Sequence, residues 1–535
     1  MVAANPLTRL RVAAAWSPLT VPAFRAVWTA VLITNIGGWM ASVATAWLMT
    51  SLDPSPLMVS LVAAATNLPL FLFALPAGAL ADIVDRRMLL IVAQIFMLAL
   101  TLVLLALTAT GLISPLMLLA LIFLIEAGTA FEAPAYLAAL PNLVPRDQLQ
   151  AALALNGVGI NLSRIVGPAL GGLVVGALGV AAALAINALS FAAVIFAYAR
   201  LPPTPRETCL PAERFMSAIR TGLRFTHESS ELKATLVRAT AFFLFASAYL
   251  ALLPLIARDR LDAGAAGFGI LFGCHGGGAV LGALLLPYIR ARFLPDQVVV
   301  GGSLLTAPMT AALAATTHMS VAVPIVLMIG VGSLAIMSTL MLSAQVALPD
   351  WVKARGLAVV QMAFSGALSV GSLAWGALAN RIGIPWSLAL AAAGLAAASM
   401  LTLRWRLGED TVNRSPSLHW PDPEVASEIP AERGPVMVLV EYRVEPARSA
   451  AFTEALERLG QVRRRDGALF WEHFTDTADP TRHIETFIAE NWIEHLRQHE
   501  RVTVADRTLE EEVNRFQMEG RQPLVTHLVS ARAGL

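Results

Sequence analysis

The chain has 535 residues, of which 57% are hydrophobic and 14% are charged, and its formal net charge is +1. Soluble globular proteins carry about 25% charged residues, so this composition excludes a soluble protein and indicates an integral membrane protein. The two cysteines, Cys209 and Cys274, fall in a charged loop and in an apolar segment, and this separation excludes a disulfide framework.

Long apolar segments recur along the chain. A helix needs about 20 residues to cross a hydrocarbon core of about 30 Å, and lipid offers no partner for unpaired backbone groups. Six apolar segments precede a charged stretch and six follow it, at residues 24–52, 57–81, 88–111, 115–137, 151–178, 180–199, 239–257, 263–289, 298–317, 320–348, 356–380 and 384–403. The sequence predicts an all-α polytopic membrane protein with 12 transmembrane helices.

The same pattern sets the expected domain boundaries. We expect a cytoplasmic N-terminal segment (1–23), a first six-helix bundle (24–199), a cytoplasmic central loop that is partly an amphipathic helix (200–238), a second six-helix bundle (239–404), a linker rich in Pro, Glu, Asp and Ser (405–435) and a soluble α+β domain (436–535). Lys and Arg concentrate in the loops on one side of the spans, which predicts that both termini are cytoplasmic.

The two halves repeat. A shift of 204 positions lays Gly78-Ala79-Leu80 on Gly282-Ala283-Leu284, and it lays Arg86 on Arg290, Pro145 on Pro349, Gly167 on Gly371 and Gly172 on Gly376. Parallel six-span repeats are typical of transporters whose binding site lies between the halves, near the middle of the membrane.

Two motifs resemble those of a known family. The stretch from Gly78 to Arg87, between the second and third spans, is similar to the loop motif of the major facilitator superfamily, although Ile83 replaces a usual Arg and Asp85 a usual Gly. The run 157–172, which ends in Gly167-Pro168-Ala-Leu-Gly171-Gly172, resembles the fifth-span motif of antiporting exporters. Over residues 24–404 the chain resembles bacterial transmembrane secretion effectors related to siderophore exporters.

The first motif predicts a gate built from Gly78, Asp82, Arg86 and Arg87. We expect Asp82 to face the start of the eleventh span near residues 354–356, where free N–H groups and the helix dipole attract a carboxylate. Arg86 and Arg87 are expected to add ion pairs, and the latch must break when the cytoplasmic side opens. The alternative is that these charges only fix the topology.

The second motif predicts a close contact of the fifth span. Gly167, Gly171 and Gly172 let helix backbones approach, and Pro168 removes a backbone donor and permits a bend. We expect this span to seal against the neighbouring half of an exporter. Ordinary helix packing is the alternative.

Glu126 and Arg164 both lie near mid-membrane, one in the fourth span and one in the fifth. Ionisable groups there cost about 3 kcal/mol or more and usually face a cavity or each other. We expect a buried ion pair in which Glu126 exchanges the proton and Arg164 is its partner or a ligand for an anionic substrate. A static structural bridge is the alternative.

Three further groups of residues have either a functional or a structural role. His275 lies mid-span, and we expect either that it titrates near neutral pH or that it is a structural histidine. The first two spans offer cavity-lining residues, of which Asn35 is the preferred substrate contact; the others are Trp39, Thr45 and Asn67. Glu132 is expected near the inner interface as a cytoplasmic-gate or headgroup contact.

The C-terminal segment alternates like a small α+β domain. Strands are expected at 436–442, 468–474, 482–490 and 523–529, and helices at 446–462, 492–500 and 506–516. The run from Asn491 to His499 resembles the antibiotic-biosynthesis-monooxygenase type of ferredoxin-like domain, and this resemblance implies dimeric α+β barrels. His495 and His499 have a metal-ligand spacing but lack a third ligand, so no metal is expected. Trp471 and Trp492 line a pocket or pack in the core.

These expectations define a secondary transporter, not an enzyme. No phosphate-binding loop is present, so an ion gradient must supply the energy. We expect a proton-coupled exporter of a small amphipathic drug, siderophore or secondary metabolite in the bacterial inner membrane. Its expected partners are that substrate, protons and lipid, with a homodimer through the C-terminal domain; no cofactor and no nucleic acid are expected. The alternative is a membrane-tethered, cofactor-independent monooxygenase or a ligand sensor, active through its C-terminal domain.

Overall fold

The computed structural model describes residues 16–201, 224–349, 351–408 and 414–531, with gaps at 418, 422, 424, 426–428 and 519–521 and without the side chains of residues 79, 82 and 83. The chain divides into two compact units. The membrane unit comprises residues Met1–Ala212, Thr235–Met341 and Val360–Arg406. The C-terminal unit comprises Glu213–Ala234, Leu342–Val359 and Leu407–Leu535.

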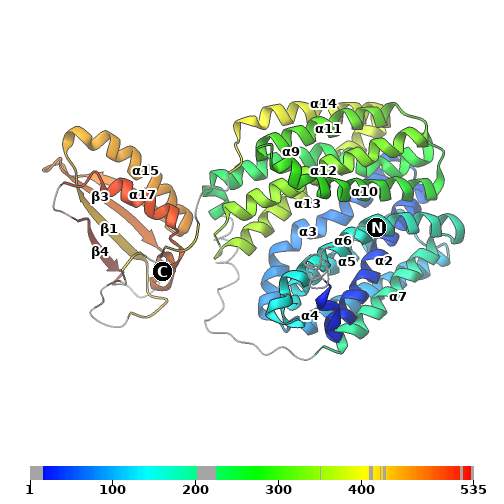
Figure 1. The fold of residues 1–535 in the computed structure, drawn as a ribbon, viewed down its shortest axis with the longest axis horizontal. Coiled ribbons are helices and arrows are strands. Elements are labelled where there is room, and N and C mark those ends of the chain that lie inside the picture. The colour runs from blue at the N-terminus through cyan, green and yellow to red at the C-terminus, as the bar shows by residue number, and fades with distance from the viewer. Residues whose placement is uncertain are drawn as a thin grey trace, which may run out of the picture. The chain divides into compact units, whose positions relative to one another are not determined.

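Twelve helices in the described residues are long and apolar enough to cross a membrane, as the sequence predicts (Figure 1). The first six are α2 (Pro22–Leu52), α3 (Pro56–Ile83), α4 (Arg86–Ala109), α5 (Pro115–Ala139), α6 (Leu149–Leu178) and α7 (Val180–Ala199). The second six are α9 (Ser230–Leu255), α10 (Gly264–Arg290), α11 (Pro295–Ala315), α12 (Met319–Ala347), α13 (Lys353–Ile382) and α14 (Ile384–Leu401). A π-helical turn, η4 (Ile256–Arg260), continues α9.

Capping residues fix where several of these helices begin. The Ser55 hydroxyl accepts a hydrogen bond from the Met58 N–H at 3.4 Å, and Ser114 does the same at the start of α5. A proline follows each serine at the first helical position, where no backbone donor is needed. The Asp85 carboxylate accepts from the Met88 N–H at 2.8 Å, so the aspartate that departs from the usual loop motif is the cap of α4.

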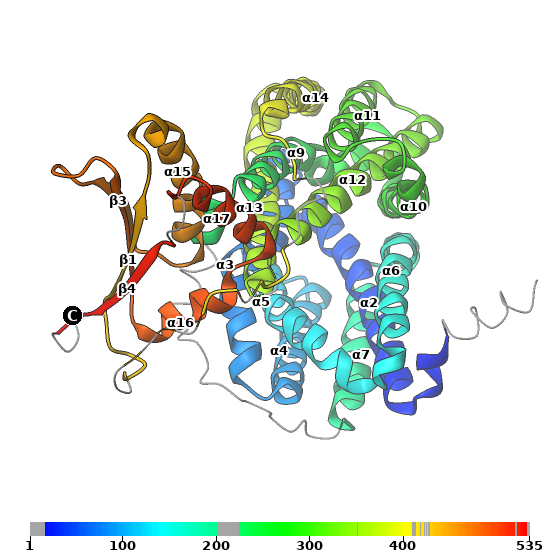
Figure 2. The same cartoon turned by 60° about the vertical axis from the view of Figure 1, so that its left-hand side comes forward.

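The helices pack within each half and across the halves. In the first half α2 packs on α6 and α7, α5 packs on α3 and α4, and α4 packs on α7; in the second half α11 packs on α14. Between the halves α6 lies against α10, as Figure 2 also shows. This arrangement brings together helices that are far apart in the sequence.

The seventh span begins at Ser230, about nine residues before the predicted start at 239. The prediction was wrong because Arg238, taken as a loop residue, lies buried inside α9. Its guanidinium pairs with the Asp296 carboxylate at 3.0 Å and donates to the Trp405 carbonyl at 2.8 Å. These partners satisfy the charge and allow the helix to continue through it.

The C-terminal unit contains a four-stranded antiparallel sheet. Its strands are β1 (Val436–Arg443), β2 (Phe470–Thr475), β3 (Arg482–Ala489) and β4 (Leu524–Val529), in the order β2-β3-β1-β4. Its helices are α15 (Ser449–Asp466), α16 (Trp492–Arg501) and α17 (Val504–Asn514). Every second residue of β1 is buried and packs with Phe452 and Leu456 of α15. The element order confirms the predicted α+β domain.

The segment expected as a linker is ordered against this domain where it is described. The Ser417 N–H donates to the Val502 carbonyl at 2.9 Å, and Pro416 pairs with Thr503 as an isolated β-bridge. The Trp420 indole donates to both oxygens of Glu510 at 3.0 Å. The linker prediction was wrong for these residues because aromatic and polar side chains within the polar run find partners on the domain.

Candidate substrate cavity, gate and C-terminal pocket

A cavity of about 360 Å³ lies between the two halves of the membrane unit. Its walls come from α2, α3 and α6 of the first half and from α9, α10, α12 and α13 of the second. Most of the lining is apolar or aromatic, including Phe242, Phe268 and Phe272. Such a surface suits the apolar part of a small molecule, and a few polar groups then fix its orientation.

Those polar groups gather around Arg164 and His275. Arg164 is the one Arg, Lys, Asp or Glu among the described lining residues, and its guanidinium lies 5.9 Å from the centre of the Trp39 ring, within cation–π range. The Tyr249 hydroxyl lies 3.4 Å from Nδ1 of His275 and 3.5 Å from the Ser333 hydroxyl. The cavity therefore presents one cation and a hydrogen-bonding cluster to a ligand.

The expected ion pair between Glu126 and Arg164 is wrong. No salt bridge joins them among the described residues, and Glu126 is not among the residues that line the cavity. The reason is helix packing: α5 packs on α3 and α4, whereas α6 packs on α2, α7 and α10. The consecutive spans α5 and α6 do not pack on each other, and only Arg164 reaches the cavity.

The preferred substrate contact of the first span is also misplaced. Trp39 and Asn67 line the cavity as expected, but Asn35 and Thr45 do not. Thr45 is buried, and its hydroxyl donates to the Ala41 carbonyl at 2.9 Å. Asn35 lies one helical turn before Trp39, outside the described lining.

The glycines of the fifth span sit where backbones touch. A Cβ atom on Gly172 would lie 2.7 Å from Cα of Gly269 and 2.8 Å from the Ala265 carbonyl on α10. A Cβ on Gly167 would lie 2.5 Å from Cβ of Trp39 on α2. The predicted contact with the other half is therefore present at Gly172, while Gly167 packs inside its own half.

The repeat reproduces these contacts in the second half. Gly376, the counterpart of Gly172, would place a Cβ 2.4 Å from Cβ of Ser60 on α3. Nearby, the Ser369 hydroxyl donates to the Ala64 carbonyl at 3.4 Å. The pairs α6–α10 and α3–α13 are thus equivalent seams between the halves.

Arg86 and Arg87 both donate hydrogen bonds to carbonyls at helix ends. Arg86 donates to the Ala138 carbonyl at 3.2 Å, at the end of α5, and Arg87 donates to the Ala199 carbonyl, at the end of α7. Positive charge is favoured at helix C-termini. Asp82 lies in the last turn of α3 with its side chain outside the described residues, and a Cβ on Gly78 would meet nothing within 4 Å.

A polar cluster inside the first half escaped the sequence reasoning. The Tyr198 hydroxyl donates to Glu132 at 3.4 Å, and the Tyr136 hydroxyl donates to Asn156 at 3.0 Å. Glu132 therefore faces α7 rather than a lipid headgroup. The one sequence signal was the spacing of Glu132 and Tyr136, four residues apart on one helical face.

The C-terminal unit has a second cavity of about 950 Å³. It lies between residues of the sheet and residues of α15, α16 and α17, and the former linker adds His419 and Trp420. Trp471 and Trp492 do not line it and pack in the core, as the structural alternative predicted.

An ionic network forms one wall of this pocket. Arg463 pairs with Glu485 at 3.2 Å and with Glu510 at 2.8 Å, and His419 lies 2.7 Å from Glu510. Burial opposes ionisation of Glu510, but the Arg463 charge and these hydrogen bonds outweigh it and lower the pKa of Glu510 to about 2. The carboxylate is therefore ionised at neutral pH.

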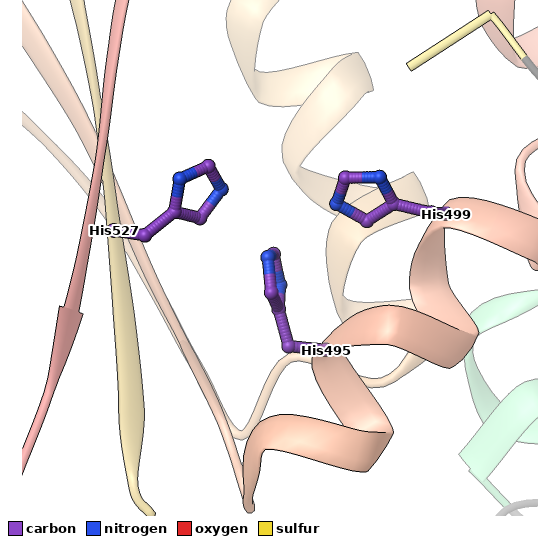
Figure 3. A group of neighbouring side chains, drawn as sticks. All are labelled: His495, His499 and His527. Carbon is purple, nitrogen blue, oxygen red and sulfur yellow. The ribbon is translucent and has the colours of Figure 1, made fainter. Parts of the chain in front are cut away.

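Three histidines also line this pocket. His495 and His499 of α16 and His527 of β4 turn their rings toward one space (Figure 3). Burial, followed by the nearby His499 and His527, lowers the pKa of His495 to about 3. The predicted pair on one helical face thus gains a third histidine from a strand.

Twelve helices in two repeated bundles around a central cavity define a membrane transporter of the major facilitator type. Solved structures support this fold: a bacterial homologue of the human lysosomal transporter Spinster, inward-facing and unoccupied, has a TM-score of 0.56 at 14% identity, over 71% of this chain and 96% of that one. A POT family transporter in complex with a thioalcohol-conjugated peptide has a TM-score of 0.59 at 12% identity, over 71% and 95%. The chain belongs to the transmembrane secretion effector family, whose profile matches residues 13–534.

Three sequence relatives are efflux or export proteins by name. The macrolide efflux protein A of Streptococcus pyogenes is 25% identical over 265 residues, 49% of this chain and 65% of that protein. The multidrug efflux pump Tap of Mycobacterium tuberculosis is 28% identical over 53% of this chain and 69% of the pump. The enterobactin exporter EntS of Shigella boydii is 29% identical over 50% and 63%. The chain thus spans about two thirds of the length of these relatives, which are transporters and not enzymes.

Proposed function

We propose that this protein is a secondary active exporter that moves a small amphipathic molecule by alternating access, with proton coupling. The cavity between the repeated halves carries the proposal, because its position is where alternating access needs a substrate site. The efflux relatives support the direction of transport. The excess of basic residues on one side favours a bacterial inner-membrane protein with both termini in the cytoplasm.

The charge of the cavity wall indicates the chemical class of the substrate. Among its described lining residues Arg164 supplies a positive charge and no carboxylate balances it. A guanidinium binds carboxylate, phenolate or catecholate oxygens through charge-assisted hydrogen bonds. An amphipathic anion of the siderophore type fits this wall better than a cationic drug.

Efflux from cells tests this substrate class. An efflux-deficient bacterial strain is grown with a panel of anionic, neutral and cationic amphipathic compounds, with and without the protein. Anionic compounds should accumulate less when the protein is present, and Arg164→Gln should abolish the effect while Arg164→Lys retains part of it. Arg25→Gln, at an exposed position of α2, is the control. Protection against cationic compounds alone would contradict the proposal.

Proton exchange is assigned to Glu126. No ion pair or hydrogen bond of the Glu126 side chain is present among the described residues. An uncompensated carboxylate within the bilayer costs about 3 kcal/mol or more, and binding a proton removes the charge. Glu126 therefore has a reason to hold a proton in one conformation and to release it in another.

The two seams between the halves, α6–α10 and α3–α13, form the proposed outer gate. Gly172 meets α10 and Gly376 meets α3 near the ends of the helices remote from the chain termini. Arg258 also donates across the halves to the Thr50 carbonyl at that end. With the termini in the cytoplasm, this conformation is closed toward the outside, and the Asp82 latch would close the other side in the opposite conformation.

A ligand-binding role of the C-terminal unit is the second candidate function, favoured by its 950 Å³ pocket. The resemblance to monooxygenase-type domains extends this candidate to oxidation of a bound substrate and to dimerisation. Truncation after Arg406 separates the roles. Efflux that survives truncation makes the unit accessory or sensory, whereas oxidation of a polycyclic compound by the full chain without added cofactor would support an enzymatic role.

A further inference from the structure

The three histidines of the C-terminal pocket are arranged as ligands. One nitrogen from each of His495, His499 and His527 lies within 4.8 Å of the others. Two come from successive turns of α16 and the third comes from β4, so a helix and a strand fix their relative positions (Figure 3). A site held between two elements of regular structure is more rigid than one built on a loop.

His495 supplies an independent observation. Its side chain is 1% exposed, and neither of its ring nitrogens makes a hydrogen bond of good geometry among the described residues, although the Gln498 side chain is near enough to act on the ring. Buried polar groups in native proteins are nearly always paired, so a buried imidazole with two unmet nitrogens needs an explanation. A bound cation that faces the other two histidines satisfies one of these nitrogens.

We propose that His495, His499 and His527 bind a divalent transition metal ion, with zinc as the expected occupant and a fourth coordination position open to the pocket. Imidazole is a good ligand for zinc, copper and nickel, and three protein ligands with one open position are typical of zinc sites that bind a further molecule. The ion would lie in the wall of the 950 Å³ pocket, where an oxygen donor of a ligand can reach it.

The three histidine nitrogens must move closer together to bind one zinc ion. Zinc–nitrogen bonds of about 2.1 Å in tetrahedral geometry place ligand nitrogens about 3.4 Å apart, so the rings must close by about 1.4 Å at most. Rotation about the side-chain bonds of His499 and His527, which are partly exposed, supplies this movement. The competing explanation is an aromatic cluster, since Trp420 packs edge-on against His499 at 4.9 Å and Trp492 lies 5.5 Å from His495.

Metal content of the full chain distinguishes the two explanations. The protein is purified in detergent without a polyhistidine tag, stripped with a chelator and dialysed against a small excess of Zn²⁺, and metal is measured by mass spectrometry. We expect about one zinc ion per chain, and a Co²⁺-loaded sample should show the visible absorption of a four-coordinate site. His527→Gln and His499→Gln should each lower the zinc content at least tenfold.

The control is His227→Gln, which removes a histidine whose side chain is 78% exposed and should leave zinc binding unchanged. Circular dichroism and gel filtration show whether each variant is folded. If a variant is unfolded, the number of zinc ions bound per wild-type chain still decides between the two explanations. Wild-type protein that retains no zinc after dialysis would overturn the site. So would folded His527→Gln and His499→Gln variants with wild-type zinc content.

Discussion

The contact of Gly172 with α10 provides the sharpest test of how the two halves move. In the Gly172→Ala variant the new Cβ atom would lie 2.7 Å from Cα of Gly269 and 2.8 Å from the Ala265 carbonyl oxygen. Both are backbone atoms, so α6 and α10 must part to accept the methyl group. Overpacking of this kind costs about 1–3 kcal/mol. Because the contact exists in this conformation, the variant should favour the alternative state by about 5–150-fold.

The same helix offers a matched control. Gly176 lies one turn beyond Gly172, and a Cβ atom there would make an ordinary contact of 3.7 Å with Cβ of Ala266. Gly176→Ala therefore adds the same methyl group, with the same gain in helix propensity, without forcing the helices apart.

The accessibility of the cavity from outside the cell measures the shift toward the alternative state. In a background with Cys209→Ser and Cys274→Ser, a Ser42→Cys substitution places one thiol on the cavity wall. Labelling of this thiol in intact cells by a membrane-impermeant maleimide should be several-fold faster with Gly172→Ala than with Gly176→Ala, and export should be slower. Equal labelling rates and equal export by the two variants would refute the assignment of the α6–α10 seam as a gate.

Three further predictions concern charges. Asp82→Asn should reduce export at least tenfold without changing membrane insertion, as measured by vesicle transport and by immunoblot; unchanged export would contradict the latch. Glu126→Gln should abolish substrate-dependent proton movement in proteoliposomes, and Glu132→Gln should not; the reverse result would move the coupling to Glu132. The depressed pKa of Glu510, about 2, gives stability that is present above about pH 4.5 and lost as the pH falls to 2. Urea titrations followed by tryptophan fluorescence should therefore show the C-terminal unit losing on the order of 3 kcal/mol over this range, and Arg463→Met should remove most of the dependence.

The membrane architecture could be predicted because the bilayer imposes it locally. Each span must be apolar over about 20 residues, so hydropathy alone located all twelve helices. The 204-residue repeat also related positions in the two halves that have equivalent contacts. It aligned Gly172 with Gly376, and both positions prove to be close contacts between the halves.

Partners distant in sequence could not be predicted in the same way. Arg238 was taken as a loop residue because its partners, Asp296 and the Trp405 carbonyl, lie 58 and 167 positions further on. The pairing of Glu126 with Arg164 assumed that consecutive spans are neighbours, and the packing of this fold separates them. Burial of a charge depends on its three-dimensional partners, which periodicity does not record.

The C-terminal pocket shows the same limit. The spacing of His495 and His499 identified one helical face, but His527 reaches it from β4, 28 positions further along the chain. His419 and Trp420 lie in a run whose composition is typical of a linker, and only the fold shows that they bind Glu510. Local composition describes the average of a segment and misses single side chains that dock.

The most direct test of the transport proposal is substrate movement by the purified protein in proteoliposomes with an imposed pH gradient. An anionic amphipathic catecholate is the probe, chosen because Arg164 is the guanidinium on the described cavity wall. We predict movement that depends on the gradient, is abolished by a protonophore and is lost in Arg164→Gln. Movement that is independent of the gradient, or an Arg164→Gln variant that matches the wild type, would contradict the account.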